Sequence, residues 1–97
     1  MLNLIIQDQE RKVAVDTYFV SDSQETNKIF GFLNNAPQGE LARYKKIEDA
    51  VRVFGDMVIA EARGLFVRLP NDDPKELASF SALVKTNTGE YFRDKIG

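Results

Sequence analysis

The sequence predicts an α+β fold, in which one long amphipathic helix packs on a mostly antiparallel sheet of about five or six short strands. Apolar and polar residues alternate through much of the first 33 residues, which is the period of a half-buried strand. Between positions 41 and 54 apolar residues instead recur every three or four residues, as in a helix. No linker or internal repeat interrupts the 97 residues, so we expect residues 1–97 to form a single domain.

Four strands are expected in the first third of the chain. These segments are residues 2–6, 12–16, 17–20 and 27–33. The polar turn at residues 8–11 separates the first two, and the third is rich in β-branched and aromatic residues. Gly31 interrupts the fourth segment, which predicts a bulge or a close approach of another part of the chain.

The long helix is expected from Glu40 to Gly55, after a cluster of Asn, Pro and Gly residues. Its apolar stripe consists of Leu41, Tyr44, Ile47, Val51 and Phe54. Gly55 can adopt the left-handed conformation that ends many helices. Val58 also falls on the stripe, so a helix that continues to Ala62 remains an alternative.

Further short elements are expected after the long helix. The candidate strands are residues 57–60, 65–69, 80–85 and 90–93. The first of them requires the helix to end at Gly55. The last two flank Asn87-Thr88-Gly89, a turn sequence typical of a hairpin. Asp73 before Pro74 indicates the start of a short helix with Asp73 as its cap.

The composition excludes several classes of function. The chain has no cysteine and no histidine, which removes a disulfide framework, a thiolate zinc site and the commonest general base. We therefore expect no cofactor and no bound metal. The net charge of −2 gives no electrostatic attraction toward nucleic acid. No apolar run is long enough to span a membrane and no signal peptide is recognisable, so we expect a cytoplasmic protein without membrane attachment.

Two segments show an order of short motifs that occurs in a known family. The first consists of Leu4-Ile5-Ile6, the turn Gln9-Glu10-Arg11, Val13-Ala14-Val15-Asp16, Ser21-Asp22 and Lys28-Ile29. It resembles the opening of the proteasome-like branch of the N-terminal-nucleophile hydrolases. The second, from Phe80 to Phe92, is similar to a late strand-turn-strand of that family. Together they cover about 40 of the 97 residues.

The family's nucleophile is a Thr, Ser or Cys at the mature N-terminus, whose free amine is the base. Here the chain begins with Met1 and Leu2, and its first hydroxyl side chain is Thr17. Asp16 and Lys28 correspond to the family's Asp and Lys, at a shorter spacing. The chain is also about half the length of a four-layered hydrolase. The resemblance therefore implies a reduced, inactive relative, and whether the protein is an enzyme stays open with absence of catalysis favoured.

Two small groups of polar residues were considered as sites. Asp16, Thr17 and Lys28 are candidates for an acid–hydroxyl–amine group, although a strand end and an edge charge explain them more simply. Asp72 and Asp73 are candidates for a divalent cation, because carboxylate oxygens suit such ions. The simpler interpretation is a loop in which Asp73 caps a helix.

An aromatic surface is the favoured functional site. Tyr18, Phe19, Phe30 and Phe32 place aromatic side chains on both faces of their strands, and one helix covers only one face of a small sheet. The excess predicts a protein–protein interface, with either another protein or a second copy of this chain.

A basic cluster is the remaining candidate. Arg43, Lys45 and Lys46 are expected on a charged helix face, where the nearby Glu48 and Asp49 offset most of the positive field. Nucleic-acid binding is therefore not favoured. The function that the sequence favours is a small cytoplasmic protein-binding or regulatory protein, such as the compact inhibitors and accessory factors that phages and mobile elements encode. The alternative is the reduced hydrolase relative.

Overall fold

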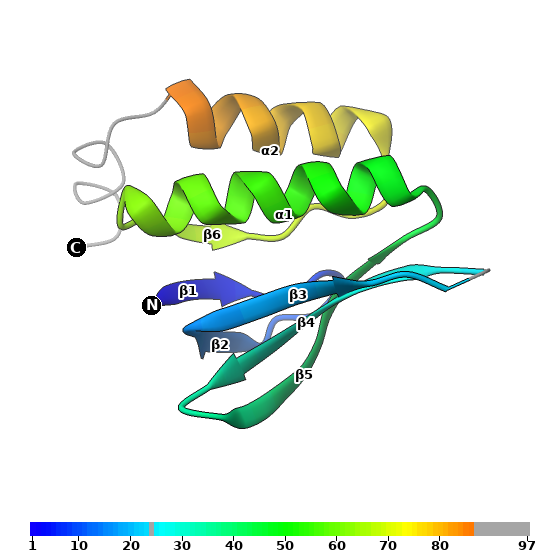
Figure 1. The fold of residues 1–97 in the computed structure, drawn as a ribbon. Helices are drawn as coiled ribbons and strands as arrows, with labels where there is room; N and C mark the ends of the chain where they lie inside the picture. The colour runs from blue at the N-terminus through cyan, green and yellow to red at the C-terminus, as the bar shows by residue number, and fades with distance from the viewer. Residues whose placement is uncertain (24, 87–97) are drawn as a thin grey trace.

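The computed structural model describes residues 1–23 and 25–86, and this part of the chain has an α+β fold. Figure 1 shows two helices lying side by side over the strands. In chain order the elements are β1 (Leu2–Ile5), β2 (Lys12–Val15), β3 (Thr17–Ser21), β4 (Asn27–Leu33), β5 (Ala36–Tyr44), α1 (Ile47–Ala62), β6 (Phe66–Arg68) and α2 (Pro74–Thr86).

The strands form two sheets of three strands each, so the prediction of a single sheet is wrong. In the first sheet, β1 pairs antiparallel with β2 and parallel with β6. In the second, β4 pairs antiparallel with β3 and β5, so the mostly antiparallel character is confirmed. The chain passes between the sheets at Asp16, whose backbone N–H donates to the carbonyl of Phe32 at 2.9 Å. The N–H of Gln7 donates to the carbonyl of Leu41 at 3.0 Å and joins the sheets at a second place.

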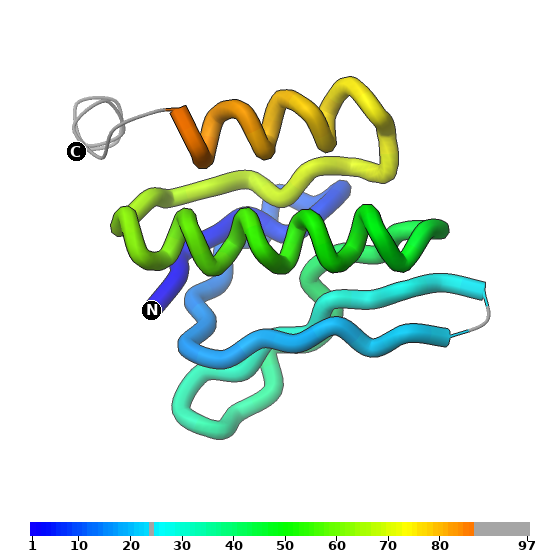
Figure 2. The backbone as a smooth tube through the Cα atoms, turned by 45° about the horizontal axis from the view of Figure 1, so that its top comes forward, coloured from blue at the N-terminus to red at the C-terminus, as the bar shows by residue number. Residues whose placement is uncertain are grey.

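The core lies between the helices and the inner faces of both sheets. Alternation within the strands turns Leu2, Leu4, Val15, Ile29 and Leu41 into it. The inner stripe of α1, at spacings of three and four, consists of Ala50, Val53, Met57 and Ala60. The buried apolar residues of α2 are Leu77, Phe80 and Val84. Figure 2 shows that α1 and α2 run in the same direction, with the β6 segment returning between them.

The long helix begins and ends later than predicted. Residues 36–44 form β5, so the prediction of a helix from Glu40 is wrong. The helix spans Ile47–Ala62, which confirms the alternative of continuation to Ala62. Gly55 lies inside α1 and does not end it, and the strand predicted for residues 57–60 is wrong for the same reason.

The second helix is longer than predicted, and the expectation of only one long helix is wrong. The strand predicted for residues 80–85 belongs to α2. The start of α2 is as expected, because Oδ2 of Asp73 accepts a hydrogen bond from the Glu76 N–H at 3.3 Å. The hairpin predicted around residues 87–93 lies outside the described residues. Among residues 1–23 and 25–86, neither helix has the length and apolar content to cross a membrane.

Candidate functional site

Three phenyl rings gather on the outer face of the β3-β4-β5 sheet. Side chains two residues apart in a strand share a face, so Phe30 and Phe32 of β4 point to the same side. The antiparallel register places Phe19 of β3 directly opposite Phe30. The Phe19 ring stacks on both neighbours, with centroids 5.7 Å from Phe30 and 5.8 Å from Phe32. Phe19, Phe30 and Phe32 are hereafter the outer aromatic face.

The outer aromatic face is open to solvent. The side chain of Phe19 is 42% exposed, and Phe30 and Phe32 are half-buried. The rings are stacked on one another, with interplanar angles of 27° and 21°, rather than covered by another element. Aromatic rings in this arrangement present a large, rigid apolar surface whose ordering on binding costs little entropy.

Tyr18 lies on the opposite face of the sheet from the other three predicted residues. Its ring contacts Phe54 of α1 edge-on, with centroids 5.4 Å apart. Its hydroxyl donates to Oε1 of Glu61 at 2.9 Å. Burial and then this hydrogen bond raise the pKa of Tyr18 above its ordinary value. Tyr18 therefore anchors α1 to β3 and is not part of the outer aromatic face.

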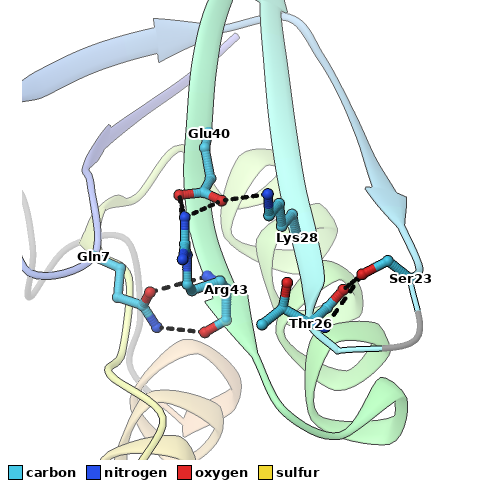
Figure 3. A network of polar contacts seen from close by, with 6 residues as sticks. All are labelled: Gln7, Ser23, Thr26, Lys28, Glu40 and Arg43. Atoms are coloured by element: carbon cyan, nitrogen blue, oxygen red, sulfur yellow. Dashed lines mark hydrogen bonds and ion pairs between the residues drawn. The ribbon is translucent and has the colours of Figure 1, made fainter.

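A charged group borders the outer aromatic face, because Glu40 of β5 pairs with Phe30 of β4. Figure 3 shows this group, Lys28, Glu40 and Arg43. Glu40 of β5 accepts two hydrogen bonds at 3.0 and 2.9 Å from one guanidinium nitrogen of Arg43, and its Oε1 is 3.8 Å from Nζ of Lys28 on β4. One carboxylate thus serves two cations, which leaves a local charge of +1 on this group. The sequence missed this arrangement because it placed Glu40 and Arg43 on a helix.

The predicted basic cluster does not form a helix face. Arg43 lies on β5, and Lys45 and Lys46 lie in the connection to α1. The backbone N–H of Lys45 donates to Oδ2 of Asp72 at 3.0 Å, which ties this connection to the loop before α2. Only Arg43 of the three therefore joins the charged border beside the aromatic rings.

The buried amide of Gln7 binds the backbone of Arg43 at the edge of β5 that faces away from β4 (Figure 3). Its Oε1 accepts from the Arg43 N–H at 2.9 Å, and its Nε2 donates to the Arg43 carbonyl at 3.1 Å. The same Nε2 donates to the carbonyl of Pro70 at 3.0 Å. One side chain thus satisfies backbone groups of β5 and of the loop before α2.

The candidate acid–hydroxyl–amine group is not assembled in the described residues. Oδ1 of Asp16 accepts a hydrogen bond from the Thr17 hydroxyl at 3.2 Å. Lys28, however, pairs with Ser21, four residues along β3 from Thr17. At about 3.3 Å per residue this separates Lys28 from Thr17 by roughly 13 Å. Lys28 therefore cannot assist a reaction at the Thr17 hydroxyl.

The candidate cation site is also explained by local bonding. Asp73 caps α2 and Asp72 accepts from Lys45, so both carboxylates already serve backbone N–H groups. Within the part of the chain that the structure describes, no three acidic residues come together as metal ligands.

Two pockets lie away from the outer aromatic face. The first pocket, of about 340 Å³, lies between β6 and α2, and the buried Leu69 and Phe80 form part of its lining. At its rim Arg68 binds Glu10, and this hydrogen bond lowers the pKa of Glu10. The other, of about 200 Å³, is lined by Gln7, Asp8, Thr26, Arg43, Tyr44, Lys45 and Asp72. The formal charges that line the second pocket balance, because Arg43 and Lys45 face Asp8 and Asp72.

The comparisons with known proteins add no functional assignment. No family model, curated protein or solved structure matches this chain.

Proposed function

We propose that this protein is a small protein-binding or regulatory module that acts in the cytoplasm through the outer aromatic face. The observation that carries the proposal is the stack of Phe19 on Phe30 and Phe32, in which Phe19 is 42% exposed and the other two rings are half-buried. Exposed apolar clusters with polar borders mark contact surfaces in soluble proteins. Aromatic residues are enriched at the centres of such surfaces, where they contribute most of the binding energy.

The charges near the rings favour a protein partner over nucleic acid. Lys28 and Arg43 share Glu40, and Asp16 directly precedes β3, so carboxylates lie among the cations near the face. A nucleic-acid site needs several cations without carboxylates between them. The partner that fits is a protein surface with an apolar centre, and with acidic residues placed to meet Lys28 and Arg43 at its edge.

The hydrolase relationship is not part of this proposal. A hydrolase of that family depends on an N-terminal nucleophile with a nearby amine or carboxylate. Asp16 and Lys28, the residues that correspond to the family's Asp and Lys, lie at opposite ends of the β3–β4 pair and do not form a shared site. The order of strands at the beginning of the chain is equally well explained by the folding of a small sheet.

A capture experiment with a double variant tests the proposal. Phe30→Thr/Phe32→Thr keeps residues that favour strands and removes two rings. We expect the immobilised wild-type protein to recover a partner from host lysate that the double variant recovers at least about tenfold less, because an aromatic anchor commonly contributes 2 kcal/mol or more. Lys75→Thr, a substitution at an exposed position of α2, is the control, and we expect it to recover as much partner as the wild type.

The experiment has two outcomes that would overturn the proposal. Equal recovery by the wild type and a correctly folded double variant, judged by circular dichroism, would show that the rings are not the contact surface. Salt-sensitive binding of a single-stranded oligonucleotide that is lost in Phe30→Thr/Phe32→Thr would assign the same face to nucleic acid.

A further inference from the structure

The open edge of β3 differs from the other end strands of the two sheets. β3 pairs only with β4, so its second edge has no strand partner in the described residues. Proteins protect such edges with charged residues or proline. The other three end strands follow this rule: β2 contains Lys12, β6 contains Arg68, and β5 contains Pro37, Glu40 and Arg43. The sequence of β3, Thr-Tyr-Phe-Val-Ser, contains neither a charge nor a proline.

A second apolar stripe of α1 lies beside this edge. Ile47, Val51 and Val58 are 42%, 54% and 47% exposed, although they are large aliphatic residues. Together with Phe54 they follow spacings of four, three and four, so they share one side of the helix. Phe54 contacts Tyr18 of β3, which places the stripe next to the open strand edge. We call Ile47, Val51, Phe54 and Val58 the outer stripe of α1.

We propose that a second copy of this chain covers both features at once, through a two-fold axis that pairs β3 with β3 and the outer stripe with the outer stripe. Each copy supplies an unprotected strand edge, which a second strand can pair with, and an apolar helix side, which a second apolar helix side can cover. A two-fold axis brings the same patch of two copies together, so a surface must complement itself. β3 and the four residues of the outer stripe carry no charge, so no like charges meet at the centre of such a contact.

The geometry of the two elements agrees with one axis. In Figures 1 and 2, β3 and α1 run alongside each other in opposite directions. Tyr18, one residue before the middle of β3, contacts Phe54 in the middle of α1 and Glu61 near its C-terminal end, so the next residue of β3, Phe19, lies alongside the middle of α1. A two-fold axis that runs beside the centre of β3, between the two copies, therefore also runs beside the centre of α1. Antiparallel pairing about that axis sets Val51 of one copy against Val58 of the other.

The available area suits a reversible dimer. A helix of 16 residues is about 24 Å long, and a helix layer over a sheet layer is about 20 Å high. This side of the molecule therefore offers on the order of 500 Å² in projection. Stable interfaces bury about 800 Å² per partner, and weaker ones bury less. We expect a dissociation constant of about 1–100 µM.

The association does not depend on the proposed function, because it uses the backbone edge of β3 and the outer stripe of α1. Phe19 is the one residue of the outer aromatic face that lies on β3. The association would nevertheless extend β3-β4-β5 into a six-stranded sheet. The Phe19 rings of the two copies would then lie near each other on one surface, and the dimer would present two outer aromatic faces side by side.

Sedimentation of the wild-type protein and three variants tests the proposal. We expect the wild type to shift from 11.0 kDa to twice that mass between about 1 and 500 µM. Val51→Glu and Val58→Lys, each at an exposed position, should raise the dissociation constant at least about 30-fold, because an interfacial charge loses its water. Phe32→Thr, which alters the outer aromatic face, should dimerise normally.

Mixing the two charge variants tests the axis itself. Because position 51 faces position 58 of the second copy, an equimolar mixture of Val51→Glu and Val58→Lys should form a heterodimer even though each alone is a monomer. Recovery of the heterodimer also shows that both variants fold. A monomeric wild type at 500 µM, dimers that persist in both charge variants, or a mixture that stays monomeric would each overturn the proposal.

Discussion

The inner and outer faces of the β3-β4-β5 sheet share one backbone but have opposite packing. On the inner face, Ile29 and Leu41 have no exposed surface. Gly31 lies beside them, and a Cβ atom added there would be 2.5 Å from Cγ1 of Val15. On the outer face, one position from Gly31 in the register, Phe19 is 42% exposed and its ring stacks on Phe30 and Phe32 of the same sheet.

The difference in packing between the two faces distinguishes residues that the fold requires from residues that can vary without loss of the fold. Close packing fixes residue size on the inner face, because an added or lost methyl group is felt throughout a dense core. On the outer face, solvent tolerates almost any side chain that suits a strand. The exposed rings of the outer face are under weaker packing constraints, which is the basis of our proposal that they bind a partner. Substitutions on the two faces should therefore have very different effects on stability.

The largest effect is expected from Gly31→Ala. The new methyl group would overlap Val15 and also approach Cδ1 of Leu41 to 2.9 Å, and both neighbours are fully buried. Overpacking of this kind costs about 1–3 kcal/mol, and we expect a loss near the upper end because neither neighbour has free space beside it. Urea denaturation followed by circular dichroism measures this loss.

Gly55→Ala is the matched control for that substitution. Gly55 lies on the exposed side of α1, with no atom within 4 Å of an added Cβ. Alanine favours a helix over glycine by about 1 kcal/mol, so the control should be more stable than the wild type. Equal stability changes in the two variants would mean that the inner face is not packed as tightly as the structure indicates.

A pair of adjacent residues gives the next largest contrast. Tyr18→Ala removes the ring that contacts Phe54 and the hydroxyl that binds Glu61, so we expect a loss of about 2 kcal/mol. Phe19→Ala removes only cross-strand ring contacts and should cost less than about 1 kcal/mol. Thermal unfolding of both variants in dilute solution measures the difference. A greater loss for Phe19→Ala would contradict the assignment of the two faces.

The alternation of residues allowed the sequence to predict much of this sheet. The segments that became β1 and β2 follow a period of two, β3 is rich in β-branched and aromatic residues, and β4 is an apolar run. The interruption at Gly31 coincides with a shift in the β4–β5 register. The same period places Phe30 and Phe32 on one face and Tyr18 and Phe19 on opposite faces. The outer aromatic face was thus partly predictable, whereas its neighbours on β5 were not.

Irregular pairing hid β5 in the sequence. The register shift between Ile29 and Phe30 leaves Leu41 without a partner on β4, so Leu41 and Ala42 are both buried. Tyr44 is buried as well, and the spacing of three from Leu41 imitates a helix. A turn signal was nevertheless present. Asn34 and Asn35 have φ angles of 53° and 67°, the left-handed conformations of a two-residue hairpin turn, which asparagine tolerates. Interpreted as a hairpin, the pair would have predicted the strand and brought Glu40 beside Lys28.

In α2 the error is the reverse, because a helical segment was predicted as a strand. Phe80, Ala82 and Val84 alternate with Ser81, Leu83 and Lys85, which suggested a strand. Leu77, Phe80 and Val84 also follow a helical spacing, and the structure follows that pattern. The polar partners of α2 were not predictable, because they come from α1. The buried carboxylate of Asp56 accepts a hydrogen bond from Ser81, whose hydroxyl in turn accepts one from Arg52.

The smallest expected effect, and the most specific to the inner face, is the pH dependence contributed by Tyr18. Burial and the hydrogen bond to Glu61 raise the pKa of Tyr18 in the folded protein above its ordinary value near 10. Below that pH both states hold the phenolic proton, and the full contribution to stability is present. As the pH rises further, the unfolded chain loses this proton while the folded protein retains it. The free energy of unfolding therefore falls.

Tyr18→Phe should remove this part of the alkaline decline. One retained proton lowers stability by at most about 1.4 kcal/mol per pH unit, and by less here because water partly screens the hydroxyl. At pH 7 the variant should lose about 1 kcal/mol with its hydrogen bond. Between pH 10 and 11 its stability should decline less steeply than that of the wild type. Phe19→Tyr places a phenol on the exposed outer face, so it should leave the slope unchanged. If urea denaturation gives the wild type and Tyr18→Phe the same decline of unfolding free energy with pH, Tyr18 is no more enclosed than Phe19. That result would contradict the difference in packing between the two faces.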